Sequence, residues 1–225
     1  MNAHDLFRPR KDSPPVKLRI ASLMVLALLA GCTRKGNLEE GGIYTVRSDC
    51  PQVAIPAATG DITTFDPVGS TASSAIDVSA TITNLRDHCQ DTTTDVISVA
   101  TFDVVATRRD AGQARQVVLP YFDVVVQAGD KVVAKRIGQV ALNFAAGSFR
   151  ASTSAQATAR VSRSAAALPA NVREILTRPR KVGDADAAID PMTDPGVRDA
   201  VAKATFQHLV GFQLTVDQLK YNATR

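Results

Sequence analysis

Apolar and polar residues alternate with a period of two in five stretches between residues 76 and 161. This period places successive side chains on opposite faces of a strand, so each stretch predicts a half-buried β-strand. The predicted strands are residues 76–83, 96–107, 116–127, 132–144 and 149–161. Short connections such as Ala128-Gly129-Asp130 predict hairpins, and hence antiparallel pairing. We expect a mainly β fold: an antiparallel β-sandwich, immunoglobulin-like or fibronectin-like, over residues 43–165.

Prolines and glycines predict where this pattern is interrupted. Residues 50–74 contain several of them and predict loops with short edge strands. Pro120 lacks an N–H group and predicts a bulge or an edge position in its strand. In the fourth strand the apolar positions change parity between Ile137 and Val140. We therefore expect a β-bulge at Gly138.

The pattern becomes helical in residues 166–225. A short helix is predicted from Pro169 to about Thr177. A second is predicted from Pro195 to about Val210, with Asp194 as its N-cap. The inward positions of the last predicted strand are mostly alanine, which leaves room for a neighbour. We expect the second helix to fill that room, so that residues 166–225 form a helical extension packed on the sandwich.

The first 31 residues have the organisation of a secretory signal. Residues 1–19 carry five basic side chains, and residues 20–30 are apolar apart from Ser22. This apolar run is too short for the roughly 20 residues that a transmembrane helix needs. A buried helix of a soluble domain is the other alternative, but it leaves the cysteine that follows unexplained.

The residues Leu29-Ala30-Gly31-Cys32 resemble the lipobox of bacterial lipoproteins. The resemblance implies cleavage between Gly31 and Cys32, then attachment of diacylglycerol to the Cys32 thiol and of further acyl chains such as palmitate. Several acyl chains hold a protein to a membrane essentially permanently. Thr33, where an aspartate would influence sorting, favours the outer membrane, with the domain facing the periplasm. Residues 32–42 are polar and predict a tether.

Charge adds little once the signal is removed. The signal contains five of the 26 basic and two of the 22 acidic residues, which leaves 21 and 20, a net charge of +1. A near-neutral protein lacks the concentrated basic face that nucleic-acid binding needs. The pairs Arg108-Arg109, Lys135-Arg136 and Arg180-Lys181 are therefore interpreted as solvated surface.

Cys50 and Cys89 are the two cysteines that follow Cys32. An exported protein meets an oxidising compartment, where an even pair of cysteines predicts a disulfide. Metal binding is the alternative, with His88 as the one neighbouring ligand, but no CxxC spacing supports it.

Candidate catalytic and ligand-binding residues are sparse. His208 is expected on the apolar side of its predicted helix, where a histidine is more often a core group than a base. Asp184, Asp186 and Asp190 resemble a sparse calcium loop, but they lack the glycine and the glutamate of an EF-hand. The sequence contains no GxSxG, HExxH or phosphate-binding glycine loop. We therefore expect no catalytic residue, no metal and no cofactor.

These observations favour a non-enzymatic structural or protein-interaction module of the cell envelope, bound to the membrane through Cys32 and to an envelope protein partner. The alternatives are a binder of a small ligand or an envelope polymer, with residues 151–159 lining a groove, and, third, a periplasmic hydrolase. An exposed apolar patch would favour the first, an enclosed pocket the second, and a buried polar triad the third.

Overall fold

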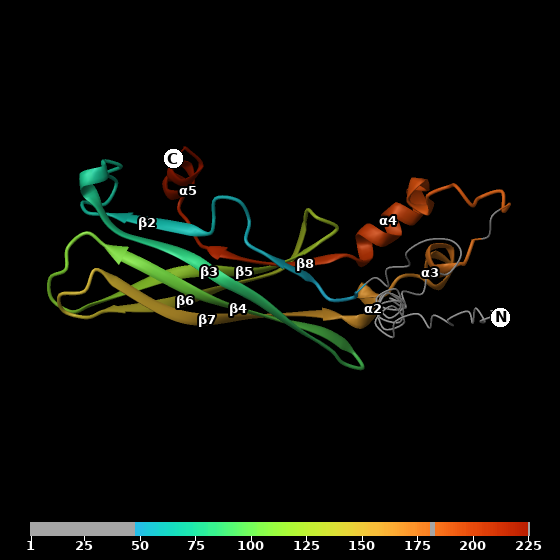
Figure 1. Ribbon diagram of the computed structural model, residues 1–225, viewed down its shortest axis with the longest axis horizontal. Helices are drawn as coiled ribbons and strands as arrows, with labels where there is room; N and C mark the ends of the chain where they lie inside the picture. Colours follow the sequence, from blue (N-terminus) through green and yellow to red (C-terminus); the bar gives the residue numbers. More distant parts are fainter. Residues whose placement is uncertain (1–47, 181–182, 225) are drawn as a thin grey trace, which may run out of the picture. The chain divides into compact units, whose positions relative to one another are not determined.

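The computed structural model describes residues 48–180 and 183–224, and the described chain is mainly β. It contains two four-stranded sheets (Figure 1). The first sheet has the order β1-β8-β5-β6, with β1 at Gln52–Ala54, β8 at Phe206–Phe212, β5 at Arg115–Gln127 and β6 at Lys131–Phe144. The second has the order β2-β3-β4-β7, with β2 at Asp61–Phe65, β3 at Ile76–Asp91, β4 at Asp95–Arg108 and β7 at Arg150–Ser162.

The five long strands predicted by alternation are confirmed as β3 to β7. All pairs within the sheets are antiparallel except β1 with β8, which is parallel. The short strands β1 and β2 lie at sheet edges, as the broken pattern of residues 50–74 predicts. The turn at residues 128–130 is also as predicted, because Ala128 and Gly129 both have positive φ, the backbone conformation that suits tight hairpins.

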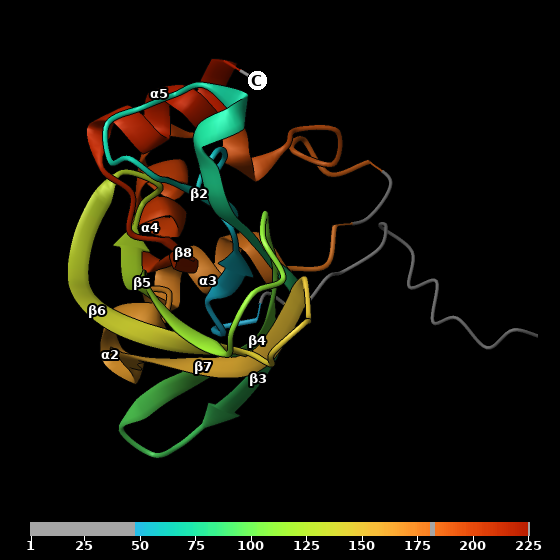
Figure 2. The same cartoon turned by 90° about the vertical axis from the view of Figure 1, so that its left-hand side faces the viewer.

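The two sheets, which Figure 2 shows from one end, enclose a common core. Buried side chains come from both: Phe102 and Val104 from β4, and Leu142 from β6, with Val210 and Phe212 from β8. The small inward residues of β7, which predict a close neighbour, pack against buried side chains of the first sheet, and Ala166 from the short helix after β7 lies in the same cluster as Ala159. Ala157 and Ala159 are buried.

The second helix ends earlier than expected. Helix α4 spans Pro195–Ala204, and its N-cap is Asp194, whose Oδ1 accepts from the N–H groups of Gly196 and Val197 at 2.7 and 3.2 Å. The chain then forms β8, an inner strand of the first sheet. The expectation of a helix to Val210 packed on β7 is wrong, because Phe206, His208, Val210 and Phe212 are buried on alternation as in a strand. The C-terminal segment thus contributes a strand as well as helices.

The remaining helices are short. They are α2 at Arg163–Ala166, α3 at Ala170–Thr177 and α5 at Val216–Thr224, with single 3₁₀ turns at Ser73–Ala75 (η1) and Pro191–Thr193 (η2). The helix predicted up to Thr177 is confirmed as α3. Helix α4 packs on α2 and the end of β5, where Gln127 Nε2 donates to the Lys203 carbonyl at 2.7 Å.

The β-bulge of β6 lies at Val133, so the prediction of a bulge at Gly138 is wrong. Gly138 pairs in register with Tyr121, whereas the register shifts where β6 passes Val133. Gly138 instead makes room for a ring: a Cβ there would lie 2.4 Å from Tyr121 Cζ. The Tyr121 hydroxyl donates to the Gln156 carbonyl of β7 at 3.1 Å, which ties the two sheets together. Pro120 lies one residue beyond the β5–β8 pairing, where its missing N–H costs no ladder bond.

Arg108 is buried rather than solvated. Its guanidinium donates to the carbonyls of Ser148, Gln113 and Ala145 at 2.7, 2.8 and 3.0 Å. It also stacks over the Phe144 ring at 5.2 Å. The interpretation of Arg108 as solvated surface is therefore wrong, because the charge fixes two neighbouring turns at one end of the sheets.

Candidate functional site

Cys32, Gly31 and the whole of residues 1–42 lie outside the described residues, so the predicted signal, lipidation and tether have no structural counterpart here. The predicted disulfide is confirmed: Cys50 and Cys89 are bonded, with Cα atoms 6.1 Å apart. The bond ties the segment before β1 to the far part of β3 and packs beside Val96 and Phe206. His88 is exposed next to it, with its Nε2 3.3 Å from Gln90 Nε2.

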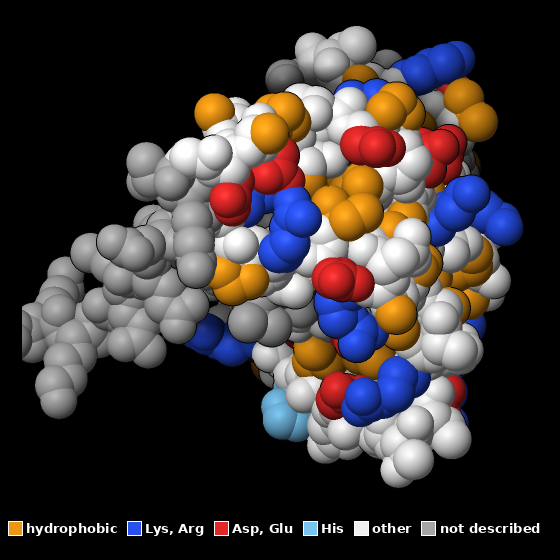
Figure 3. All heavy atoms as spheres, turned by 90° about the vertical axis from the view of Figure 1, so that its right-hand side faces the viewer, with side chains coloured by type: hydrophobic (Ala, Val, Ile, Leu, Met, Phe, Trp, Pro, Cys, Tyr) orange, Lys and Arg blue, Asp and Glu red, His pale blue; other side chains and the backbone are white. Residues whose placement is uncertain are grey.

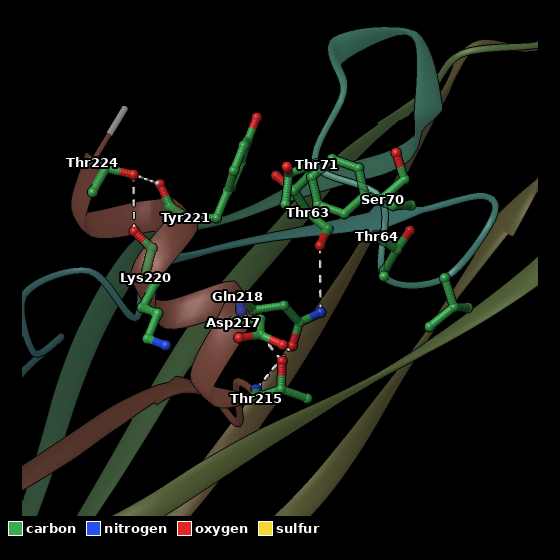
Figure 4. A pocket seen from close by; sticks show the side chains of 13 residues that line it. Thr63, Thr64, Ser70, Thr71, Thr215, Asp217, Gln218, Lys220, Tyr221 and Thr224 are labelled. Carbon is green, nitrogen blue, oxygen red and sulfur yellow. Dashed lines mark hydrogen bonds between the residues drawn. The ribbon is translucent and has the colours of Figure 1, made fainter.

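A groove of about 890 Å³ lies between β2, the loop at residues 68–71 and α5 (Figure 4). This volume is typical of small-molecule sites. Phe65 and Tyr221 meet edge to face in its wall, with ring centroids 5.1 Å apart. Val68 is almost fully exposed at its rim.

Helix α5 is held in place by its own side chains. Thr215 and Gln218 cap each other: the Gln218 N–H donates to Thr215 Oγ1 at 3.2 Å, and the Thr215 N–H donates to Gln218 Oε1 at 2.9 Å. Asn222 Nδ2 donates to the carbonyls of Ala58 and Asp61 at 2.9 and 2.7 Å. The helix therefore forms a fixed wall of the groove.

Internal hydrogen bonds occupy two hydroxyls on the side of the groove opposite α5. Thr64 Oγ1 accepts from the Val78 N–H at 3.2 Å, and Ser70 Oγ accepts from the Ala72 N–H at 3.3 Å. Asp217 and Lys220 add one charge of each sign. The groove is therefore suited to an uncharged, partly apolar molecule. The sequence motif that marks it is the capping box at Thr215, which predicts the helix but not the groove.

A second arrangement brings together Ser98, His208 and Asp123. His208 Nδ1 lies 3.0 Å from Ser98 Oγ, and His208 Nε2 lies 3.0 Å from Asp123 Oδ1. The Nε2 contact has the distance of an ion pair but not the alignment of a hydrogen bond. Ser98 Oγ also donates to Asp87 Oδ1 at 2.9 Å. The group spans both sheets, since Ser98 and Asp87 belong to the second and the other two residues to the first.

This arrangement is a buried polar contact between the two sheets and not an accessible catalytic triad. Ser98 and His208 are both 0% exposed, so no substrate reaches the hydroxyl. The two ring nitrogens also have the opposite partners to those in serine hydrolases. There the nucleophile contacts Nε2 and the carboxylate contacts Nδ1, whereas His208 contacts Ser98 through Nδ1 and Asp123 through Nε2. His208 is thus a buried core residue, as the sequence predicts. It lies on a strand, however, and not on the predicted helix. Linking polar groups in a core fixes the pairing of its elements.

Two titratable groups in the described part of the chain have clearly shifted pKa values. Ser154 Oγ and Asn84 Nδ2 donate to the half-buried Asp103 carboxylate at 2.6 and 2.8 Å, and these bonds lower the pKa of Asp103. Burial raises the pKa of Tyr121, and the neighbouring Asp123 charge raises it further. Neither group lies in the groove.

The acidic loop that resembles a calcium site uses its carboxylates within the protein. Asp186 pairs with Arg178, and Asp190 caps η2 by accepting from the Met192 N–H at 2.9 Å. Among the described residues no group of three or more His, Cys, Asp or Glu side chains is placed to hold a metal ion.

The surface at the end where α3 and α4 lie mixes basic, acidic and apolar side chains (Figure 3). Such mixing is usual for a solvated surface. Within residues 48–180 and 183–224, no helix is long and apolar enough to span a membrane.

Comparisons with protein-family models, with curated proteins and with solved structures find no match to this chain.

Proposed function

We propose that this protein is a lipoprotein of the cell envelope, anchored by acyl chains on Cys32 to the outer membrane and facing the periplasm. The observation that carries the proposal is the lipobox Leu29-Ala30-Gly31-Cys32 after a basic and then an apolar segment. The Cys50–Cys89 disulfide supports it, because such bonds persist in oxidising compartments and are rare in the cytosol.

Intact mass measurement tests the anchor. Wild-type protein from membranes should begin at Cys32 and carry the mass of diacylglycerol and an acyl chain. Cys32→Ala should accumulate as an unacylated precursor. Cys50→Ala is the matched control, because it removes a thiol without touching the lipobox, and its acylation should be unchanged. A wild-type chain that begins elsewhere without acyl groups would refute the proposal.

We propose further that the domain is a non-enzymatic interaction module. Its Ser–His–Asp arrangement supports this choice over a hydrolase, because a nucleophile must be reachable and Ser98 is not. Exposed apolar side chains outside β6, such as Val105 at 43% and Phe149 at 56% exposure, are available for protein contacts. Cross-linking in intact cells tests this candidate: a defined envelope protein should be recovered with wild type and lost when these side chains are replaced by charged ones.

Small-ligand binding is the second candidate, and the groove beside α5 favours it. Native mass spectrometry of protein released gently from membranes should show an added mass. Tyr221→Ala should lose that mass, whereas Val118→Ala, at an exposed position on β5 away from the groove, should keep it. Equal spectra for wild type and Tyr221→Ala would refute this candidate.

We also propose that the two sheets form a sandwich of the immunoglobulin-like or fibronectin-like type. The common core of two four-stranded, mostly antiparallel sheets supports it. The parallel β1–β8 pair and the helices between β7 and β8 are elaborations of that plan. An experimental structure with a different order of strands would refute it.

A further inference from the structure

The first half of β6 is exposed on both faces. Each of residues 131–137 is exposed, whereas Val140, Leu142 and Phe144 in the second half are buried in the core. Strand β6 is the last strand of its sheet, so this segment pairs with β5 alone. We call residues 131–137 the basic segment.

The basic segment combines apolar and positive side chains. Val132, Val133 and Ile137 are 58%, 44% and 54% exposed. Lys131, Lys135 and Arg136 lie among them, and β6 contains no acidic residue.

The nearby carboxylates leave most of this charge uncompensated. Asp130 precedes the segment in the hairpin turn, and Asp123, the cross-strand neighbour of Arg136, is buried against His208. Arg136 donates to the Thr158 carbonyl at 3.2 Å, and the Lys135 ammonium lies 5.8 Å from the Phe122 ring centre. Neither contact neutralises a cation. Charge complementarity therefore points to an anionic occupant with apolar material behind it.

The basic segment also lies at the end of the sheet where the chain enters the domain. Val132 pairs with Val126, Val126 with Gln207, and Gln207 with Gln52, the first residue of β1. These four residues form one row across the first sheet, so Val132 lies about 14 Å from Gln52 at the usual strand spacing. A membrane anchor that precedes Ser48 would hold this end of the domain close to the bilayer.

An added strand from a partner protein fits this edge less well. Strand addition requires a regular row of free backbone groups along the edge. The register shift at Val133 interrupts that row, and such bulges are a common protection of edge strands. The observations therefore favour a contact made by side chains.

We propose that the basic segment is a second membrane contact, which binds the anionic phospholipid surface next to the acyl anchor. The inference rests on the proposed anchoring at Cys32. Lys131, Lys135 and Arg136 would meet lipid phosphates, while Val132, Val133 and Ile137 enter the interface. The anchor then sets where the domain is held, and the basic segment sets how it is oriented.

Amine labelling of the acylated mature protein in vesicles tests the proposal. One vesicle contains neutral phospholipid alone, and the other contains equal neutral and anionic phospholipid. Each basic side chain near an anionic surface contributes about fivefold to binding, so labelling of Lys131 and Lys135 should slow about fivefold or more in the anionic vesicles. Lys220, exposed on α5, is the internal control and should label equally in both. High salt should remove the protection.

Two matched variants separate the contact from folding. Ile137→Asp places a negative charge at an exposed position and should restore labelling of both lysines with an unchanged melting temperature. Val118→Asp makes the same change at a position 47% exposed on β5, outside the basic segment, and should leave the protection intact.

Intact mass of the same samples reports the anchor separately. An acylated protein whose Lys131 and Lys135 label as fast as Lys220 in anionic vesicles refutes the second contact and leaves the anchoring standing. A protein without acyl groups refutes the anchoring and this inference with it. Protection found only in native membranes, and in neither vesicle, also refutes the lipid contact and identifies a protein partner instead.

Discussion

Replacing Gly138 by alanine should destabilise the whole domain, although the residue lies on an edge strand. The added Cβ would lie 2.4 to 2.6 Å from two ring carbons and the hydroxyl oxygen of Tyr121, so the ring must move. Gly138 has no positive φ, and the cost therefore comes from the contact alone. Forcing extra volume into a packed site costs about 1–3 kcal/mol. Displacing Tyr121 also loses its bond to the Gln156 carbonyl, worth about 1 kcal/mol.

The two costs add to about 2–4 kcal/mol, a fall of about 5–15 °C in melting temperature for a domain of this size. Thermal and urea unfolding followed by circular dichroism measure both. Gly112→Ala is the matched control, because nothing lies within 4 Å of a Cβ there and the residue has no positive φ. That change should be neutral or stabilise by about 0.4–1 kcal/mol.

A double-mutant cycle identifies the cause. In a Tyr121→Ala background, Gly138→Ala should cost less than about 1 kcal/mol, because the ring that it meets is gone. The reasoning is refuted if Gly138→Ala melts within error of wild type. It is also refuted if the cost is the same with and without Tyr121.

Three further outcomes are expected. Removing the disulfide with Cys50→Ala and Cys89→Ala should cost about 4 kcal/mol on the chain-entropy model, for a sequence separation of 39, as measured by urea unfolding. Ser154→Ala removes the main cause of the lowered pKa of Asp103, so that pKa should rise in a carboxyl NMR titration. The associated stability is present above the unfolded pKa and lost as pH falls, and the variant should weaken this acid dependence. Burial raises the pKa of Tyr121, so its stabilising contribution is complete below about pH 10 and is lost as pH rises through the folded pKa. Tyr121→Phe should flatten that alkaline fall in stability.

Local pattern predicts the long strands of this fold because burial on one face imposes a period of two on the residues themselves. The segment around His208 is harder, since Val201, Thr205, His208 and Leu209 also fit a helical face. What decides its structure is pairing with β1 and β5, which lie far away in the chain. No local pattern contains that information.

The same limit applies to the sites. Ser98 and His208 are 110 residues apart, and the groove combines β2 with a helix at the other end of the chain. Arg108 departs from its sequence pattern for a related reason: a dibasic pair predicts exposure on average, but four carbonyl groups at one corner accept hydrogen bonds from its guanidinium. The disulfide was predictable because it depends on compartment and on the parity of cysteines rather than on geometry.

The place of β8 also has a consequence for the order of folding. An inner strand of the first sheet is made from Phe206–Phe212, near the end of the chain, and it separates β1 from β5. During synthesis, the first sheet therefore lacks its inner strand until residues 206–212 have left the ribosome. Contacts of such long sequence separation form slowly. Under the proposed export as an unfolded chain, this delay would keep the precursor unfolded until β8 has crossed the membrane, and β8 would then complete the first sheet.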